Sequence, residues 1–235
     1  MFETNSYDNP KVLPANTRNC WEFMETNSAA AVIRTVCPNE WADIVKVLSE
    51  FRLKPRDWLK PGGNRGDVAA IIDGMFHKLG WKEARLDLET KGIIIGRDNK
   101  VIKKLPIVKQ EGYLIDDVKG RIALDVEWNA KDGNLDRDLS TYRSCYEAGV
   151  ISAGVIITKD RQSLLDLANN LWCEYEKTLP QKERTGKLPI DLKTSTTTTF
   201  DKAKMRIRRG VMGTCPVLIV AATDKTWDHT PYTNY

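Results

Sequence analysis

Four stretches of the chain repeat apolar residues at three- and four-residue spacing, which is the period of one helix face. The stretches are 39–51 after Pro38, 68–79 before Gly80, 137–148 before Gly149, and 164–179 before Pro180. Proline and glycine at such positions are typical of helix boundaries. The pattern therefore predicts four amphipathic helices, and Asn39 is expected to cap the first one.

Between these helices, three stretches have the patterns of β-strands. Residues 149–158 and 215–223 are continuous runs of small and β-branched apolar residues, which are typical of strands covered on both faces. Residues 121–128 alternate instead, so that Asp125 and Glu127 share one face and apolar side chains share the other. These elements predict an α/β fold in which helices sandwich a central β-sheet.

The composition is that of an ordinary globular chain: 235 residues with 41 % hydrophobic residues, 29 % charged residues and a formal net charge of +4. A chain of this length buries a core without disulfide staples. We find no internal repeat and no linker rich in Gly, Pro or Ser, so one domain over residues 1–235 is expected. The absence of a long apolar run and of a signal-peptide pattern favours a cytoplasmic protein without membrane contact.

Histidine and cysteine are poorly placed for metal or nucleophilic chemistry. The only histidines are His77 and His229, and the five cysteines show no C-x-x-C spacing, which argues against zinc ribbons and Ser-His-Asp hydrolysis. His77 falls near the apolar stripe of its predicted helix and is expected to pack in the core. Any hydrolysis is therefore expected to depend on carboxylates.

Three carboxylates are expected to lie close together. Asp125 and Glu127 are two residues apart on one strand, so their side chains project from the same face. Residues 112–120 read as a short strand and a turn, which brings Asp116 beside Asp125 across a hairpin. Such a pair is also typical of the solvated face of an edge strand. Inside a sheet, however, unpaired carboxylates are costly to bury, and a divalent cation removes that cost.

The positive charge is concentrated in residues 182–210, which contain nine basic and three acidic residues. The segment also holds the polar run Ser195 to Thr199, and we interpret it as a long cationic loop that faces a polyanion. Oxygen ligands suit Mg²⁺ or Mn²⁺, which activate water and stabilise charge on a phosphate. The sequence thus indicates phosphodiester hydrolysis.

The carboxylates lie in a longer string that resembles a known family. Asp116 followed nine residues later by Asp125-Val126-Glu127 resembles the Asp…(Asp/Glu)-x-Lys site of the restriction-endonuclease-like nucleases. The extended strings 125–132, 136–139 and 154–158 are similar to those of BglII-like type II restriction endonucleases. The resemblance implies a central mixed β-sheet flanked by helices, a homodimer, and Mg²⁺-dependent cleavage of double-stranded DNA at a short palindrome, with Mn²⁺ as a substitute.

Carried over position by position, the resemblance makes Asp116 and Asp125 the metal ligands and Glu127 the third catalytic residue. Glu127 stands where most of the fold has lysine, so its role and the number of metal ions stay open. No proline precedes Asp116, and Asp117 is an alternative ligand, although the spacing of Asp116 to Asp125 fits better.

Polar and basic residues after the active strand and in the cationic segment are candidates for DNA contacts, because Arg, Lys, Asn, Ser and Thr bind bases or phosphates. The candidates are Asn129, Lys131, Asp132, Thr196, Thr197, Thr198, Thr199, Lys202, Lys204, Arg206, Arg208 and Arg209.

Other functions remain compatible with these residues. A repair or junction-resolving nuclease of the same fold would use the same carboxylates, and a non-catalytic DNA-binding module would retain the basic segment. A glycosidase fits less well, because carboxylates that flank a sugar are not expected so close together on one strand.

Overall fold

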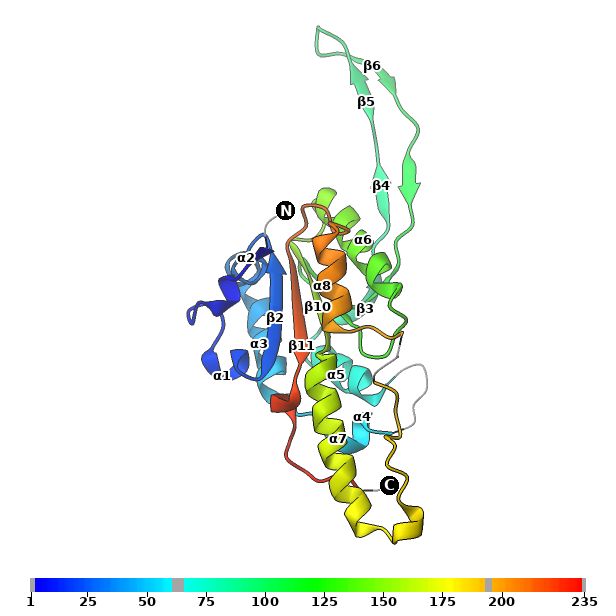
Figure 1. Ribbon diagram of the computed structural model, residues 1–235. Coiled ribbons are helices and arrows are strands. Elements are labelled where there is room, and N and C mark those ends of the chain that lie inside the picture. The colour runs from blue at the N-terminus through cyan, green and yellow to red at the C-terminus, as the bar shows by residue number, and fades with distance from the viewer. Residues whose placement is uncertain (1–2, 61–65, 193–195, 234–235) are drawn as a thin grey trace.

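One mixed sheet of seven strands runs through the computed structural model, which describes residues 3–60, 66–192 and 196–233 (Figure 1). The strands are β1 (Glu3–Thr4), β2 (Trp21–Thr26), β3 (Lys82–Arg85), β4 (Leu88–Thr90), β5 (Ile93–Ile95), β6 (Val101–Lys104), β7 (Val108–Gln110), β8 (Leu114–Lys119), β9 (Ile122–Val126), β10 (Ala153–Lys159) and β11 (Val217–Ala222). The order in the sheet is β1-β2-β11-β10-β9-β8-β3. Strands β9, β10 and β11 are parallel, and β8 and β2 flank them in antiparallel orientation.

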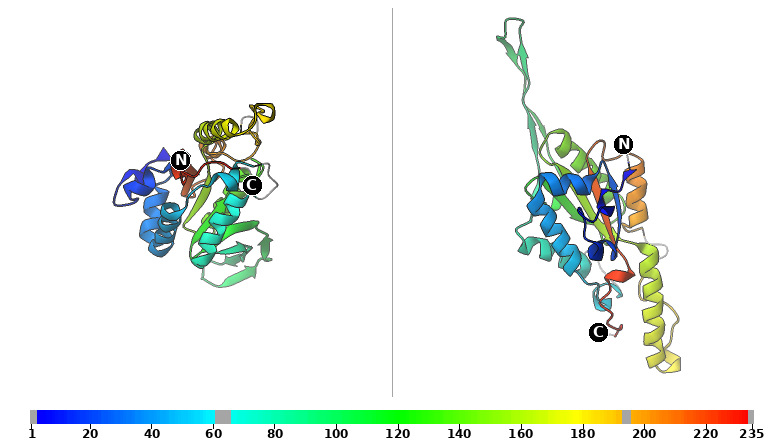
Figure 2. Two further views of the ribbon diagram at one scale, coloured as in Figure 1. Left: turned by 90° about the horizontal axis from the view of Figure 1, so that it is seen from below. Right: turned by 90° about the vertical axis from the view of Figure 1, so that its left-hand side faces the viewer.

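Helices cover both faces of this sheet (Figure 2). They are α1 (Ala15–Arg18), α2 (Ala29–Val36), α3 (Pro38–Glu50), α4 (Pro55–Trp58), α5 (Asp67–Lys78), α6 (Asn134–Glu147), α7 (Arg161–Thr178) and α8 (Phe200–Arg208), with 3-10 turns η1 (Ser6–Asp8), η2 (Gln181–Glu183) and η3 (Asp224–Thr226). Buried residues of α2, α3, α5 and α7 pack with Leu124 and Val126 on one face. Those of α6 and α8 pack with Ala123 and Ile219 on the other. The predicted sandwich of helices around a mixed sheet is confirmed.

The four predicted helices correspond to α3, α5, α6 and α7, and the two continuous apolar runs to the parallel strands β10 and β11. The cap of α3 was misassigned. Pro38 is already the first helical residue and Cys37 precedes it as the N-cap, because proline lacks the N–H that the first turn leaves unpaired. In the described part of the chain, none of the helices combines the length and hydrophobicity that a membrane span requires.

The expectation of a loop throughout residues 182–210 is wrong for its last third, which forms α8. Phe200, Ala203 and Ile207 are buried on the α6 side of the sheet, so one face of this basic helix supplies core residues. Thr199 caps the helix by accepting a hydrogen bond from the Lys202 N–H. Lys193 and Ser195 of the expected loop lie outside the described residues.

A long two-stranded ribbon leaves the body between β3 and β8 (Figure 1). Within it β4 pairs with β7 and β5 pairs with β6, both antiparallel. The periodicity of the sequence did not predict these strands.

Candidate active site

The β8–β9 hairpin brings Asp116 beside Asp125. Its register pairs Asp117 with Leu124, and continuing that register places Asp116 opposite Asp125. The Asp116 N–H donates to Asp125 Oδ1 at 3.1 Å, and the Val126 N–H donates to Asp116 Oδ2 at 3.0 Å. The two acidic side chains therefore share one face of the hairpin, each held by the backbone of the opposite strand.

Asp117 lies on the opposite face of the same strand. Its carboxylate is fully buried, and its Oδ1 is 3.3 Å from Nε2 of His77 on α5. This position separates it from Asp125 and leaves Asp116 as the neighbour of Asp125. The expectation that His77 packs in the core is wrong, since its side chain is 45 % exposed at the end of α5.

Glu127 follows β9 directly and remains attached to the sheet through its N–H, which donates to the Ile157 carbonyl oxygen at 2.8 Å. Its side chain is buried against Asp138 of α6. Burial, and then the charges of Asp138 and Asp125, raise the pKa of Glu127 to about 9. Burial also raises the pKa of Asp138 to about 6, although Arg137, 2.9 Å away, acts in the opposite direction.

A hydrogen bond from neutral Glu127 to the Asp138 carboxylate raises the pKa of Glu127 further and lowers the pKa of Asp138, against the effect of burial. Within the described residues, no other donor reaches Glu127 Oε2 or Asp138 Oδ2, and both atoms are buried. An acidic cluster of this kind, without enough donors, is the electrostatic environment that a cation stabilises.

Tyr142, on α6, holds Asp125 from inside the protein. Its hydroxyl lies at hydrogen-bond distance from Asp125 Oδ2 and 2.9 Å from the Val155 carbonyl oxygen. The single hydroxyl hydrogen of Tyr142 cannot be donated to both oxygens. If Asp125 is neutral, it donates its proton to the Tyr142 hydroxyl, and Tyr142 donates to the Val155 carbonyl oxygen. Burial and the charges of Asp138 and Asp116 raise the pKa of Asp125 well above its usual value, in agreement with this arrangement.

A cleft of about 220 Å³ opens at the ends of β9 and α6. It is lined by Gly66, Ala69, Asp73, Asp116, Val126, Glu127, Trp128, Asn129, Ala130, Asn134 and Arg137. The sequence-based candidates Asp116, Glu127 and Asn129 thus meet at one opening. Asp125 is 2 % exposed and lies behind them.

The sequence analysis missed Asp73, Asp138, Tyr142 and Lys159 as parts of this site. Asp138 and Tyr142 are four residues apart on α6, and that helical spacing, directly after the acidic strand, could have identified them. Asp73 comes from α5, and only the packing of α5 on β8 and β9 brings it to the cleft.

Lys159 ends β10 as a buried cation beside this cleft. Its Nζ donates to the Trp128 carbonyl oxygen and, at 3.0 Å, to Asn129 Oδ1, and it lies 5.4 Å from the centre of the Trp128 ring. Burial, assisted by the charge of Lys202, lowers the pKa of Lys159 to about 7. The lysine fixes the turn that carries Asn129 into the cleft.

The residues fit a divalent cation as a site with few protein ligands. Among residues 3–60, 66–192 and 196–233, no three Asp, Glu, His or Cys side chains are arranged as ligands of one metal ion. The expected convergence of three carboxylates is therefore wrong for this arrangement, because Asp125 is turned toward Tyr142 and Glu127 toward Asp138. Mg²⁺ commonly binds one or two protein carboxylates and completes its shell with water and phosphate. Asp116 and Asp125 can supply these two carboxylates.

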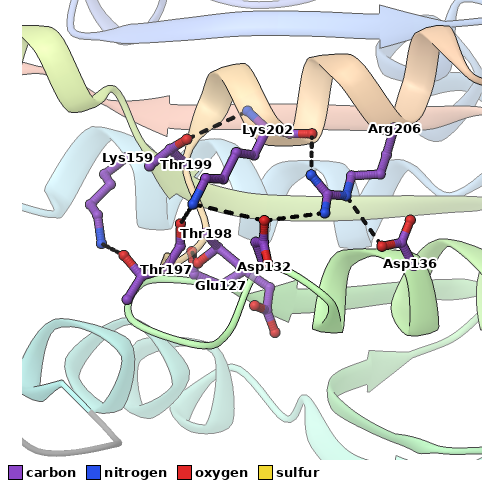
Figure 3. Close-up of polar contacts among 9 residues, drawn as sticks. All are labelled: Glu127, Asp132, Asp136, Lys159, Thr197, Thr198, Thr199, Lys202 and Arg206. Atoms are coloured by element: carbon purple, nitrogen blue, oxygen red, sulfur yellow. Dashed lines mark hydrogen bonds and ion pairs between the residues drawn. The ribbon is translucent and has the colours of Figure 1, made fainter. Parts of the chain in front are cut away.

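Three of the proposed DNA-contact residues are used inside the protein (Figure 3). Thr198 is fully buried and donates to the Glu127 carbonyl oxygen at 2.7 Å, and Thr199 is buried as the cap of α8. Arg206 is 8 % exposed and pairs with Asp132 and Asp136 at 3.4 and 3.3 Å. Their side chains join α8 to the active strand, so assigning them to DNA contacts was wrong.

The remaining candidates keep accessible side chains. Lys131, Thr196, Arg208 and Arg209 are exposed, and Thr197, Lys202 and Lys204 are half-buried. Asp132 is 40 % exposed and faces Lys202 and Arg206. Because Arg208 and Arg209 end α8 while Thr199 begins it, about 14 Å of helix separates them from the Glu127 end.

Fold and site together define a class of protein. A mixed sheet between helices, with acidic residues on an antiparallel hairpin that opens into a cleft, is the restriction-endonuclease-like architecture. Residues 21–222 match the family model described as "Restriction endonuclease BglII/BglIII". The chain therefore belongs to the BglII/BglIII restriction endonuclease family, which makes it a nuclease. No curated protein matched the chain.

Proposed function

We propose that the protein is a type II restriction endonuclease, which hydrolyses phosphodiester bonds of double-stranded DNA at a short palindromic site with Mg²⁺. Mn²⁺ is expected to substitute for Mg²⁺. The observation that carries the proposal is the hydrogen-bonded pairing of Asp116 with Asp125 at a cleft that Glu127 also lines, within a chain of this family.

Asp116 and Asp125 are the residues that would hold the metal ion. When bound, the ion supplies an acidified water and neutralises charge on the phosphate. Asp116 lines the cleft directly, and Tyr142 fixes the orientation of Asp125 behind it. The cation would also lower the raised pKa of both Asp125 and Glu127, since opposite charge favours their ionised forms.

Glu127, ionised when the cation is bound, is proposed to orient the attacking water and to take its proton. The position suits a base, because Glu127 lines the cleft. Asp138 holds the proton that Glu127 releases or shares, and Arg137 compensates the charge of Asp138. A carboxylate at this position cannot supply the positive charge of lysine. Arg137 is the cationic side chain that lines the cleft beside it.

The protein is proposed to act as a homodimer. One cleft of this kind cuts one strand, and a two-fold axis presents a second cleft to the other strand of a palindrome. The proposed DNA contacts are Asn129, Lys131 and Asp132 beside the cleft, and Thr196, Thr197, Lys202, Lys204, Arg208 and Arg209 around α8.

Digestion of a fully sequenced plasmid tests the proposal. With Mg²⁺ the wild-type protein should give discrete fragments whose sequenced ends share one palindrome, and EDTA should stop cutting. Asp116→Asn should lose cutting, while its matched control Asp117→Asn should retain it, because only Asp116 faces Asp125.

Other products would support other functions. Cutting confined to branched or damaged DNA would indicate a repair or junction nuclease. Metal-independent binding without any cutting would indicate a DNA-binding module and would overturn the catalytic proposal.

A further inference from the structure

The two-stranded ribbon of residues 86–112, called the ribbon arm below, stands away from the body in Figure 1 and in the right-hand view of Figure 2. Backbone pairing extends from its base to its tip, with one register shift between Ile94 and Ile95. The Gly112 N–H donates to Asp87 at 3.0 Å at the base, the Leu105 N–H to the Gly92 carbonyl oxygen at 2.9 Å, and the Gly96 N–H to the Lys100 carbonyl oxygen at 2.8 Å near the tip. An isolated two-stranded ribbon is only marginally stable in water, so a partner surface is expected to stabilise it.

Exposed apolar side chains are concentrated on the ribbon arm. Among the described residues, eight of the fourteen exposed large hydrophobic side chains belong to it, with exposed fractions from 43 to 69 %. They are Ile93, Ile94, Ile95, Val101, Ile102, Leu105, Ile107 and Val108. Apolar surface of this kind is typical of an interaction site.

The outer part of the ribbon arm is also strongly basic. Residues 91–109 contain six basic residues and one acidic residue, Asp98, so this short segment carries a formal charge of +5. Four of the cations form no ion pair within the part of the chain that the structure describes: Lys91, Arg97, Lys103 and Lys104. Asp87, Glu89 and Glu111 near the base reduce the formal charge of the whole arm, residues 86–112, to +2, so the positive charge lies in its outer part.

We propose that the ribbon arm binds along the DNA duplex outside the cleft, an inference that rests on the proposed nuclease function. The charge is complementary to the phosphate backbone, and a two-stranded β-ribbon fits the width of the major groove. The isoleucine and valine side chains between the lysines contact the thymine methyl groups and sugars that line a groove. A second copy of this chain is a weaker candidate, because the outer segments of two arms, residues 91–109 with a formal charge of +5 each, repel each other.

The base of the ribbon arm adjoins the active site. Tyr113 directly follows the arm, and the guanidinium of Arg137, which lines the cleft, lies 5.8 Å from its ring centre. Asp116 is three residues further along the same chain segment. The twelve residue-to-residue steps from Gly112 to Lys100 span about 40 Å when extended, slightly more than one turn of DNA. The arm would thus extend the protein–DNA contact from the cleft by about one turn of the DNA helix.

The test measures how binding of a 40-base-pair duplex depends on salt, in EDTA, so that no cutting occurs. The arm variant is Lys91→Gln/Lys103→Gln/Lys104→Gln. Its matched control removes three exposed lysines from the α1–α4 side of the body, Lys11→Gln/Lys46→Gln/Lys54→Gln. Each lost phosphate contact lowers the slope of log K against log[salt] by about 0.9. The arm variant should therefore lose about 2 to 3 from the slope and at least tenfold in affinity, and the control should behave as wild type.

Equal slopes for the wild type and the arm variant would overturn the proposal. So would a change from dimer to monomer in sedimentation with the slope unchanged, which would assign the ribbon arm to contact between copies. The plasmid assay separates this result from the nuclease proposal. A protein that does not cut but shows the slope difference would lose the catalytic assignment alone, and a protein that cuts with equal slopes would lose the arm assignment alone.

Discussion

Glu127→Gln provides a quantitative test of the electrostatics of the cleft. Glu127 has a pKa of about 9 in the folded protein and a reference value of 4.5, so the folded state binds its proton more tightly than the unfolded chain does. The direction of the pH dependence follows from the linkage between proton binding and folding. The stability that this group contributes is fully present below the unfolded pKa and is lost as the pH rises toward the folded pKa.

The magnitude follows from the size of that shift. One pKa unit corresponds to about 1.4 kcal/mol, so wild-type protein without divalent ions should lose on the order of 5 kcal/mol between about pH 5 and pH 9. Asp125 and Asp138 titrate in the same cluster and share this loss. Glutamine has nearly the same shape and no charge, so the variant should lose less stability than the wild type over this range.

The assay is urea unfolding in EDTA at intervals across that pH range. Glu50→Gln, which changes an exposed carboxylate at the end of α3, is the matched control and should follow the wild-type curve. Adding Mg²⁺ should stabilise the wild type more at high pH, because the ion binds the ionised carboxylates. Parallel curves for wild type and Glu127→Gln would refute the buried acidic cluster.

Three further substitutions test the parts that support the carboxylates. Tyr142→Phe should destabilise the protein by about 1 to 3 kcal/mol and slow cutting at least tenfold by releasing Asp125; unchanged cutting would show that the hydroxyl does not position it. Gly154→Ala should be destabilising by about 1 to 3 kcal/mol, seen as a lower melting temperature, because its Cβ would overlap the ring of Tyr142; a wild-type melting temperature would contradict that packing. Lys159→Met should slow cutting by releasing Asn129, and a wild-type cutting rate would exclude the anchoring role. The pKa of this buried lysine is about 7 in the folded protein and 10.5 in the reference state, so wild-type stability should gain a contribution as the pH rises from about 7 toward 10.5. The variant should lack that contribution.

Local patterns in the sequence were enough to predict the central architecture. The apolar runs of β10 and β11 and the helical stripe of α7 reflect burial on two faces and on one face, respectively. The alternation in β9 predicted that Asp125 and Glu127 share a face, and the nine-residue spacing favoured Asp116 over Asp117. The structure places these residues accordingly, since Asp117 contacts His77 on the other side of the sheet.

Features set by tertiary contacts were not accessible in the same way. The basic residues around Arg206 suggested a loop, because a helix of nine residues with four cations shows its apolar stripe only weakly against the charge. The burial of Lys159 depends on oxygens from two distant turns, Asn129 and Thr197, which no local pattern brings together. The ribbon arm has a mixed pattern, because both of its faces are exposed and neither is selected for a core.

Anomalous scattering from a crystal soaked in Mn²⁺ is the most direct test of the central claim, which is that Asp116 and Asp125 bind the catalytic cation. The account predicts one peak within bonding distance of carboxylate oxygens of both residues, on the cleft side of β8 and β9, and its loss in Asp116→Asn but not in Asp117→Asn. A peak bound elsewhere, or none in a crystal of protein that cuts DNA with Mn²⁺, would contradict it.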